Sequence, residues 1–430
     1  MDIIISANKT FLNAMYSDAH AKAERSYIRS VFVYARQKAD GTVLLYNTLY
    51  NSLVRLSDAE YKQFLECCAE RSQTATEFIE NGFWVPAAFD EKQRYIDAAH
   101  QFTLDFQRPL SVTITTTLRC NARCPYCYEA GVRQRDIAPR AVEHIVDFIK
   151  AKSTQNKVNI NLFGGEPLLN APFIRMLFER LKREEMAFSS YLITNGSLID
   201  SEILNEFAEW NVENAQISLD GTANEYERRK RYIGSNGGMF QKVLDNIGLL
   251  LQHDVFVHIR LNISRENRDD ILHLIPELDA RFGGFENAVY YPAFLSGTAN
   301  PLSEAEKIDF VARLLGTVKD PQKLTAGTKF YDAPRMHSCM IQDPFSFTID
   351  VEGNIFYCEH LVGHSDKAIG NIFSNANFDD MRTSAPNLLT ECSDCVFLPK
   401  CFGGCSSNRK NGDDPCMIEK YLISAYMELL

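Results

Sequence analysis

The sequence predicts an α/β protein: a partial (β/α)6 TIM barrel, preceded by a small winged-helix-like domain and followed by a cysteine-rich domain. Three observations lead to this prediction. Apolar runs and amphipathic stretches alternate six times in the middle of the chain, whereas the first 107 residues show strands followed by helices. Ten of the 12 cysteines fall in two groups, at 120–127 and 339–416. We therefore expect domains at 1–107, 108–325 and 326–430.

Composition and charge narrow the class of protein. The 430 residues are 45% hydrophobic and 23% charged, which is ordinary for a globular protein with a large core. A net charge of −11 disfavours nucleic acid as the main partner. No signal-peptide core and no apolar run of ~20 residues is present, so we expect no membrane and a cytoplasmic protein. In that reducing compartment, dense cysteine indicates metal binding or catalysis.

The N-terminal domain begins with β-rich runs at 30–36 and 42–46, separated by the hairpin signal Asp40-Gly41. A third strand is expected at 53–56, and a helix from Ser57-Asp58 to about Arg71. This order predicts a winged-helix-like domain that docks a peptide. The alternative is a packing extension with no ligand.

Cys67 and Cys68 lie in the helix predicted for this domain. Adjacent helical residues point ~100° apart, which makes the two thiols poor joint ligands. We interpret them as buried structural thiols.

The barrel is predicted from six strands, at 111–117, 158–163, 191–194, 215–219, 255–263 and 288–294. Most are apolar enough to be buried on both faces, as parallel strands are. The clearest helix between them carries apolar residues at helical spacing, namely Phe240, Val243, Leu244, Ile247 and Leu251. Six such units make a parallel sheet that curves toward a barrel, two units short of the usual eight.

Polar signatures follow four successive strands. Cys120 comes after the first strand, 163–167 (FGGEP) ends the second, 194–196 (TNG) the third and 218–221 (SLDG) the fourth. The active site of such a barrel lies at the carboxyl ends of its strands. The sequence therefore predicts a site at this edge.

Three cysteines in this edge have an unusual spacing. Cys120, Cys124 and Cys127 form a CxxxCxxC triplet, whereas zinc sites and disulfide frameworks usually show CxxC pairs. Three thiolates can hold three corners of a 4Fe–4S cube and leave the fourth iron open for chemistry.

The 326–430 segment has Gly and Asn turns and little periodicity, so we expect metal to hold its fold. Its cysteines follow a second pattern. Cys339 is followed after thirteen residues by Gly353 and after four more by Cys358. The later cysteines are Cys392, Cys395, Cys401, Cys405 and Cys416.

This combination resembles the radical S-adenosylmethionine (SAM) enzymes with a SPASM domain, over roughly residues 108–416. Their loop is CxxxCxΦC with an aromatic residue at Φ, which is Tyr126 here. The resemblance implies that Cys120, Cys124 and Cys127 bind a 4Fe–4S cluster whose open iron is chelated by SAM. The backbone of Tyr126 would meet the adenine. An electron from the cluster would then release a 5′-deoxyadenosyl radical.

The resemblance also implies further SAM-binding residues, namely Gly164, Gly165, Glu166, Pro167, Ser218 and Asp220. The glycines let the backbone approach the ligand closely, and Glu166 offers a carboxylate to the SAM ammonium. Ser218 and Asp220 match the ribose-binding strand end; alternatively, Asp220 is a turn former. Arg229 or Arg231 could meet the SAM carboxylate, with a solvated basic run as the alternative.

Two auxiliary 4Fe–4S clusters are implied in the C-terminal domain, which makes three clusters in the chain. One would be held by Cys339, Cys358 and Cys405, and the other by Cys392, Cys395, Cys401 and Cys416. The alternative, structural zinc, fits poorly because seven cysteines do not divide into sets of four.

The first auxiliary group lacks a fourth cysteine. Its cluster either has an open iron or takes a non-cysteine ligand such as His337 or Asp343. We hypothesise that a substrate thiolate binds there.

Glu359 directly follows Cys358, where sulfatase-maturing members of the family carry a proton-accepting Asp. We expect Glu359 to act as a general base, with a solvated acid as the alternative. His360 and His364 have no spacing argument and are interpreted as structural.

These features predict a radical SAM peptide maturase. Its substrate would be a ribosomally made precursor peptide whose leader binds residues 1–107. The product would be a thioether crosslink in the first place and a carbon–carbon crosslink in the second. The electron donor would be a flavodoxin or ferredoxin.

Three rival functions are open. An anaerobic sulfatase-maturating enzyme resembles the chain from the triplet onward, but the long N-terminal domain and Glu359 weigh against it. A non-catalytic iron–sulfur carrier or redox sensor would not need the FGGEP and SLDG motifs. A nucleic-acid-modifying enzyme is disfavoured by the acidic charge.

Overall fold

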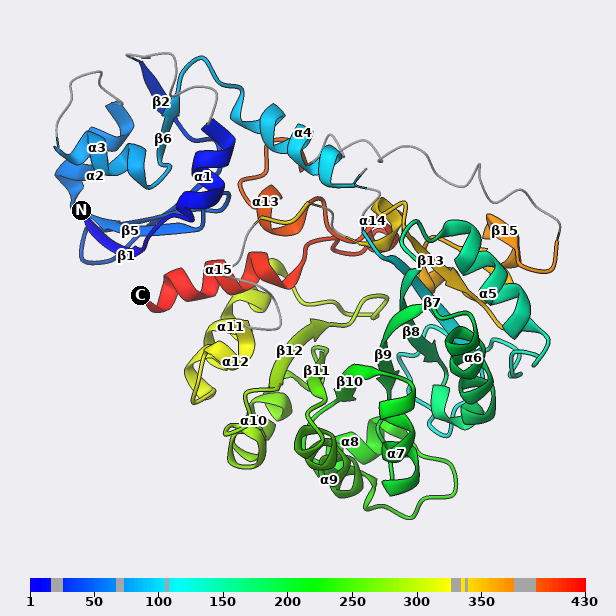
Figure 1. The fold of residues 1–430 in the computed structure, drawn as a ribbon. Helices are drawn as coiled ribbons and strands as arrows, with labels where there is room; N and C mark the ends of the chain where they lie inside the picture. Colours follow the sequence, from blue (N-terminus) through cyan, green and yellow to red (C-terminus); the bar gives the residue numbers. More distant parts are fainter. Residues whose placement is uncertain are drawn as a thin grey trace.

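The computed structural model describes residues 1–16, 26–66, 73–103, 105, 108–325, 334–336, 339–374 and 392–430 (Figure 1). Cys67, Cys68 and His337 lie outside the described residues, so the predictions about them stay predictions. No helix in the described ranges is long and apolar enough to cross a membrane.

The core of the molecule is a nine-stranded sheet in the order β12-β11-β10-β9-β8-β7-β13-β14-β15. The six strands predicted for the barrel run parallel to one another in chain order. They are β7 (Leu110–Thr117), β8 (Lys157–Gly164), β9 (Ala187–Thr194), β10 (Val212–Leu219), β11 (Phe256–Ile263) and β12 (Ala288–Phe294). Since β12 ends the sheet unpaired, the barrel is open, as expected.

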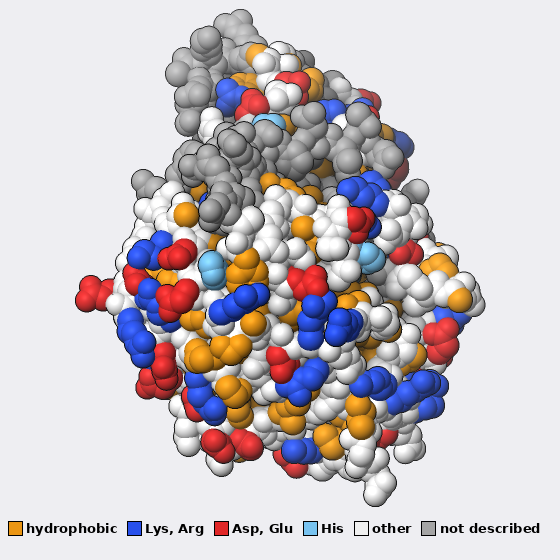
Figure 2. All heavy atoms as spheres, turned by 90° about the vertical axis from the view of Figure 1, so that its right-hand side faces the viewer, with side chains coloured by type: hydrophobic (Ala, Val, Ile, Leu, Met, Phe, Trp, Pro, Cys, Tyr) orange, Lys and Arg blue, Asp and Glu red, His pale blue; other side chains and the backbone are white. Residues whose placement is uncertain are grey.

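Helices connect these strands and lie outside the sheet in Figure 1. They are α5 (Ala141–Lys152), α6 (Ala171–Arg183), α7 (Ser201–Glu209), α8 (Ala223–Lys230), α9 (Met239–Gln252), α10 (Arg268–Phe282) and α11 (Glu304–Thr317). The apolar stripe predicted for α9 is buried, from Phe240 to Leu251. Opposite charges pair on the outer helices, as with Lys150 and Glu184 or Arg175 and Glu206. Basic and acidic side chains are accordingly interspersed on the face in Figure 2.

The two faces of the parallel sheet differ in character. Ile160, Ile217 and Ile259 are fully buried, whereas the alternate positions carry polar side chains that are half-buried, such as Gln216 and His258. Successive residues of a strand point to opposite faces. The prediction that most of these strands are buried on both faces therefore holds for β7 and β12 but not for β8, β9, β10 and β11, where half-buried residues alternate with buried ones on the inner face of the open barrel.

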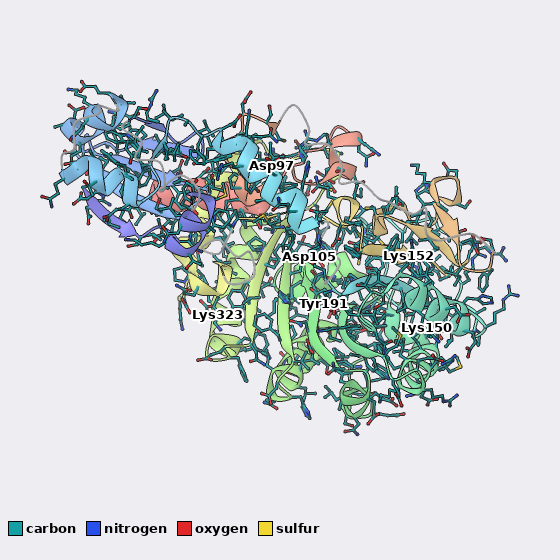
Figure 3. All side chains as sticks on the ribbon, turned by 45° about the horizontal axis from the view of Figure 1, so that its top comes forward. Asp97, Asp105, Lys150, Lys152, Tyr191 and Lys323 are labelled. Carbon is teal, nitrogen blue, oxygen red and sulfur yellow. The ribbon has the colours of Figure 1, made fainter. Side chains whose placement is uncertain are left out.

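Tyr191 on β9 marks the middle of this inner face in Figure 3. Its ring meets that of His258 on β11 edge-on at 5.8 Å. Across the first two strands the inner face is joined by side-chain hydrogen bonds, such as Asn161 Nδ2 to Ser111 Oγ (3.3 Å) and to Thr113 Oγ1 (3.1 Å).

The C-terminal segment extends the same sheet. β13 (Ser346–Ile349) runs parallel to β7, and β14 (Asn354–Phe356) and β15 (Gly370–Asn371) follow it antiparallel. A C-terminal helix, α15 (Ile418–Leu429), packs on α11 with Tyr421 and Leu422 buried. Neither β13 nor α15 was predicted from the sequence. Both join the core of the barrel.

The N-terminal residues form a second, antiparallel sheet in the order β1-β5-β4-β3. Its strands are β1 (Asp2–Ile5), β3 (Val33–Gln37), β4 (Val43–Asn47) and β5 (Ser52–Leu56). The predicted hairpin is confirmed, and Asp40 closes its turn by accepting hydrogen bonds from Thr42. The other elements are α1 (Lys9–Tyr16), β2 (Tyr27–Arg29), α2 (Asp58–Glu66), α3 (Gln73–Glu80), β6 (Trp84–Pro86) and α4 (Glu91–Thr103).

This N-terminal sheet contacts the C-terminal segment, and Figure 1 shows the two side by side. Tyr34 on β3 packs against Phe397 with ring centroids 4.9 Å apart. Lys38 Nζ donates to the carbonyl of Glu428 (2.7 Å), and Arg55 donates to the carbonyl of Leu430. The two ends of the chain therefore support each other.

Candidate active site

The cysteine triplet lies in the loop between β7 and α5, at the carboxyl edge of the sheet. All three cysteines line one cavity of about 420 Å³, together with Gly164 and Gly165 at the end of β8. Cys120 Sγ accepts a hydrogen bond from the backbone N–H of Ala122 (3.4 Å). Burial raises the pKa of the Cys120 thiol to about 11, and Glu166 and the other two thiols add to the shift.

This donor set fits a 4Fe–4S cluster. Three thiols converge on a cavity, and thiolates are the ligands that iron–sulfur clusters use. The structure thus brings the triplet and the FGGEP motif together, as the sequence analysis expected.

Close backbone contacts explain why two positions of this motif are glycine, and these contacts were not predicted from the sequence. A Cβ on Gly164, whose φ is +136°, would lie 2.1 Å from the carbonyl oxygen of Thr117. A Cβ on Gly165 would lie 2.4 Å from that of Arg119. The backbone N–H of Gly165 donates to Thr117 (3.0 Å), and that of Glu166 donates to Arg119 (2.9 Å). Glycine at both positions therefore lets the end of β8 pack directly on the cysteine loop.

Glu166 is a fully buried carboxylate at the end of β8. It accepts hydrogen bonds from Thr194 Oγ1 (2.8 Å), from the backbone N–H of Asn195 (2.8 Å) and from that of Leu168 (3.2 Å). Pro167 begins the short η1 turn (Pro167–Asn170) behind it. Burial raises the pKa of Glu166 to about 7, although these hydrogen bonds oppose the shift. A bound cation would complete the ionisation of this carboxylate.

Lys230, at the end of α8, joins the remaining predicted SAM-binding residues. Its Nζ donates to Ser218 Oγ (2.6 Å) and to the hydroxyl of Tyr126 (3.4 Å), and it lies 3.1 Å from Asp220 Oδ2. Burial lowers the pKa of Lys230, but Asp220 and Tyr126 outweigh this and hold the pKa well above its ordinary value. Asn262 Nδ2 donates to Tyr126 (3.2 Å) and to Asp220 Oδ1 (3.3 Å). Asp220 is therefore an ion-pair partner and not merely a turn former.

The sequence analysis missed Lys230 and Asn262. Lys230 stands in the basic run 228–231, and nothing in that run shows which residue turns inward. Arg229 is also buried there, with its guanidinium 5.4 Å from the ring of Tyr126 and 3.9 Å from Asp220. Arg231 ends α8 with φ +50° on the surface. Of the two arginines considered for the SAM carboxylate, only Arg229 lies at the site.

A second cavity, of about 340 Å³, lies between the barrel and the C-terminal segment. Cys339, Cys358 and Cys405 all line it, and Arg260 and Tyr291 line it from β11 and β12. Burial raises the pKa of Cys358 to about 12, with further contributions from Glu359 and the other two thiols. The three cysteines predicted for the first auxiliary group thus lie around one cavity that faces the barrel.

Of the two non-cysteine candidates for the fourth ligand, only Asp343 can be placed. His337 is outside the described residues. Asp343 is in an ion pair with Arg108 (2.6 Å) and does not line the cavity.

The predicted second auxiliary group gathers around α13 (Leu398–Cys401). The backbone N–H of Cys395 donates to the carbonyl of Cys392 (3.2 Å). Burial raises the pKa of Cys401 to about 12, with contributions from Cys416 and Cys392. Within the described ranges, no three Cys, His, Asp or Glu side chains are arranged around a single metal ion. Both groups offer several thiols, the donors that iron–sulfur clusters use.

Glu359 lies on the wall of the second cavity beside Arg260. Burial raises its pKa and Arg260 opposes the shift; the side chain is half-buried, and its role as a general base stays a prediction. Burial and Glu359 raise the pKa of Glu129, on the cysteine loop, to about 7. Between the two segments, the ring of Tyr128 stacks on that of His360 at 4.5 Å. His364 is exposed.

Arg260 and Glu129 also escaped the sequence analysis. Arg260 is the one fully charged residue in the β11 sequence FVHIRLNI, and Glu129 stands two residues after the triplet. Both features can be read from the sequence alone. Arg260 pairs in register with Ser218 on one side and Tyr291 on the other. It therefore stands between the Lys230 cluster and the second cavity.

Comparisons with known proteins agree with this geometry. Residues 114–277 match the model of the radical SAM superfamily, whose members use a 4Fe–4S cluster and SAM. The chain is 23% identical to the PqqA peptide cyclase of Rhodopseudomonas palustris, over 70% of this chain and 82% of the relative. It is 23% identical to the serine-type anaerobic sulfatase-maturating enzyme of Bacteroides thetaiotaomicron (71% and 84%).

A third relative is the radical SAM cyclopropyl synthase TigE of Paramaledivibacter caminithermalis, 20% identical over 57% of this chain. The match spans 59% of the length of TigE. Among solved structures, anSMEcpe with bound AdoMet and Kp18Cys peptide superposes with a TM-score of 0.58 at 19% identity, covering 75% of this chain and 96% of that one. The chain therefore contains a radical SAM domain and is an enzyme related to peptide cyclases and sulfatase-maturating enzymes.

Proposed function

We propose that the protein is a radical SAM peptide maturase with three 4Fe–4S clusters. One observation carries the proposal: two cysteine-lined cavities lie at the carboxyl edge of the barrel, and the ring of Tyr128 from the first stacks on that of His360 from the second. A substrate residue held between them would face the SAM site on one side and the first auxiliary group on the other.

The residues of the first cavity and its neighbours bind the cofactors. Cys120, Cys124 and Cys127 hold the first cluster. Glu166 accepts a hydrogen bond from the SAM ammonium. Three other hydrogen-bond donors already hold its buried carboxylate in place. When bound, the cluster and SAM supply a 5′-deoxyadenosyl radical that removes a hydrogen atom from the substrate.

The polar cluster around Lys230 positions the nucleoside. Ser218 and Asp220 bind the ribose, with Lys230 and Asn262 fixing their side chains. Tyr126 meets the adenine through its backbone, and Arg229 is the residue that meets the SAM carboxylate. The buried guanidinium of Arg229 would otherwise have only distant carboxylates, at 3.6 Å and 3.9 Å.

The second cavity holds the reacting part of the peptide. Cys339, Cys358 and Cys405 would hold the first auxiliary cluster, to which a peptide cysteine thiolate would bind. Glu359 accepts the proton that bond closure releases. Cys392, Cys395, Cys401 and Cys416 hold the second auxiliary cluster. The product is a thioether crosslink, or failing that a carbon–carbon crosslink.

The proposed domains are those predicted from the sequence. Residues 1–107 form a winged-helix-like domain that docks the leader of a precursor peptide, 108–325 the barrel and 326–430 the SPASM domain. A flavodoxin or ferredoxin reduces the first cluster.

A second candidate function is formylglycine formation on a sulfatase. The relation to sulfatase-maturating enzymes and the superposition on anSMEcpe favour it. Glu359 and the N-terminal sheet packed on α15 favour the peptide maturase.

The test uses the full chain, reconstituted without oxygen, with SAM, dithionite and the small peptides encoded beside its gene. The proposal expects 5′-deoxyadenosine together with a peptide that loses hydrogen, keeps its sulfur and shows a crosslink in tandem mass spectra. A sulfatase-derived cysteine peptide converted to formylglycine, with the encoded peptides unchanged, would favour the second function. SAM cleavage with neither product would contradict both.

A further inference from the structure

The second auxiliary group has a cation directly on one of its sulfurs. Arg409 lies on α14 (Ser406–Lys410), and its Nη2 donates to Cys392 Sγ (3.3 Å) and to the carbonyl of Gly403 (2.8 Å). The carbonyl pins the guanidinium, so its charge stays beside the sulfur. An ionised donor makes a stronger hydrogen bond than a backbone amide does.

A second cation stands near another sulfur of the same group. Lys420 on α15 has its Nζ 4.0 Å from Cys416 Sγ and 2.8 Å from Glu304 Oε2. The side chain of this lysine is mostly buried, with 18% of it exposed. Burial raises the pKa of Cys416 to about 11; Lys420 opposes that shift, and the neighbouring carboxylate of Asp414 adds to it. Both cations come from helices that the barrel itself does not supply.

The first auxiliary group differs in the donors that reach its sulfurs, although Arg260 and Lys307 line the same cavity. Cys405 Sγ accepts its hydrogen bond from a neutral donor, the backbone N–H of Asn408 (3.4 Å). The charged neighbour of Cys358 is the carboxyl group of Glu359. Among the residues that the structure describes, no Lys or Arg donates to Cys339, Cys358 or Cys405.

These surroundings bear on electron transfer. The reduction potential of an iron–sulfur cluster follows its net charge and the hydrogen bonds to its sulfurs. Reduction adds a negative charge, so a cation fixed nearby stabilises the reduced form and raises the potential. An adjacent carboxylate acts in the opposite direction.

We propose that Arg409, assisted by Lys420, raises the potential of the cluster held by Cys392, Cys395, Cys401 and Cys416, which makes that cluster the acceptor of the electron released by substrate oxidation. The inference rests on the proposed function and deepens it. When the crosslink closes, the substrate radical loses one electron and one proton. The proton goes to the base in the second cavity. The electron would be taken up by the cluster held by Cys392, Cys395, Cys401 and Cys416 and would leave to an oxidised one-electron protein carrier of the flavodoxin or ferredoxin type.

The experiment is a potentiometric titration of the reconstituted full chain, followed by electron paramagnetic resonance. The signal of the second auxiliary cluster is identified by its loss in Cys392→Ala. Arg409→Gln should move the midpoint of that signal to lower potential and leave the other two in place, because the hydrogen bond can persist but the charge is lost. Arg409→Lys should restore part of the shift, and Lys420→Gln should give a smaller downward shift. Arg183→Gln, an exposed arginine on α6, is the matched control and should change no midpoint.

Two results would overturn the inference. One is an Arg409→Gln protein with full iron content and an unchanged midpoint. If Arg409→Gln loses the cluster instead, an unchanged midpoint in Lys420→Gln, with full iron content, would overturn it. Failure of the proposed function is distinct, because a wild-type chain that modifies no peptide still permits the titration. A normal crosslink with no midpoint shift in Arg409→Gln would contradict the inference alone.

Discussion

The two faces of the parallel sheet are made by the same strands but serve different ends. On the helix-covered face, Ile217 of β10 and Ile259 of β11 are fully buried among apolar side chains. One residue away on the same strands, Ser218 and Arg260 point to the open inner face and its polar clusters. Packing therefore determines one face and ligand chemistry the other. Substitutions on the two faces should fail in different ways.

The largest effect is expected for Glu166→Gln, at the inner edge. The amide keeps the size of the side chain but cannot offer a charge to an ammonium group. Losing one partner of a buried charge pair costs roughly 2–5 kcal/mol, and SAM binding measured by calorimetry should weaken accordingly. Glu179→Gln, exposed on α6, is the control. SAM affinity equal to wild type in Glu166→Gln would remove Glu166 from the site.

On the helix-covered face, Ile217→Ala should cost about 2–5 kcal/mol of unfolding free energy, because it leaves a cavity in the core. Its neighbour Gln216 is half-buried on the inner face, and Gln216→Ala should stay within about 0.5 kcal/mol. Urea denaturation of both variants measures the contrast. Equal losses would mean that the two faces are not distinct.

Arg260→Met separates stability from function most clearly. Nε of Arg260 is buried without a hydrogen-bond partner in the described structure, so replacing it should leave unfolding free energy unchanged or slightly raised. Peptide modification should fall about tenfold, or about 1.4 kcal/mol, because a residue that lines the second cavity is lost. SAM cleavage without peptide provides the comparison. A destabilised variant with normal peptide turnover would contradict this placement.

A further effect should appear as a dependence on pH. The pKa of Glu166 is raised by burial to about 7 from an ordinary value of 4.5. A carboxyl with a raised pKa favours folding below its ordinary pKa, and this contribution is lost as pH rises through about 7. The SAM-free protein should thus lose stability between these values, and Glu166→Gln should lose less. Added SAM should remove the difference by pairing the carboxylate. Parallel pH profiles in both proteins would contradict the assignment.

The sequence predicted the elements that depend on regular patterns. Six parallel strands and the apolar stripe of α9 follow from periodicity, and the hairpin follows from Asp40-Gly41. The cysteines were found because their spacing carries information. The glycines of the FGGEP motif were predicted to let the backbone approach a ligand. Their close packing on Thr117 and Arg119 could not be predicted, because these residues are far away in sequence.

What escaped prediction depends on tertiary contacts. Lys230 is one of four consecutive basic residues. Which of them points into the site depends on where α8 ends, and the sequence does not show this. Asn262 and Arg260 look like interruptions of an apolar strand until the sheet is seen to be open on that side. β13 was hidden because its partner, β7, lies more than two hundred residues earlier in the chain.

Iron analysis of the chain purified without oxygen tests the central claim most directly. Three groups of cysteines that each hold a 4Fe–4S cube require ~12 irons per chain, with matching acid-labile sulfide. We predict that value, with a loss of about four irons in Cys120→Ala and again in Cys395→Ala. Zinc in place of iron, or an iron content unaffected by either substitution, would contradict the account.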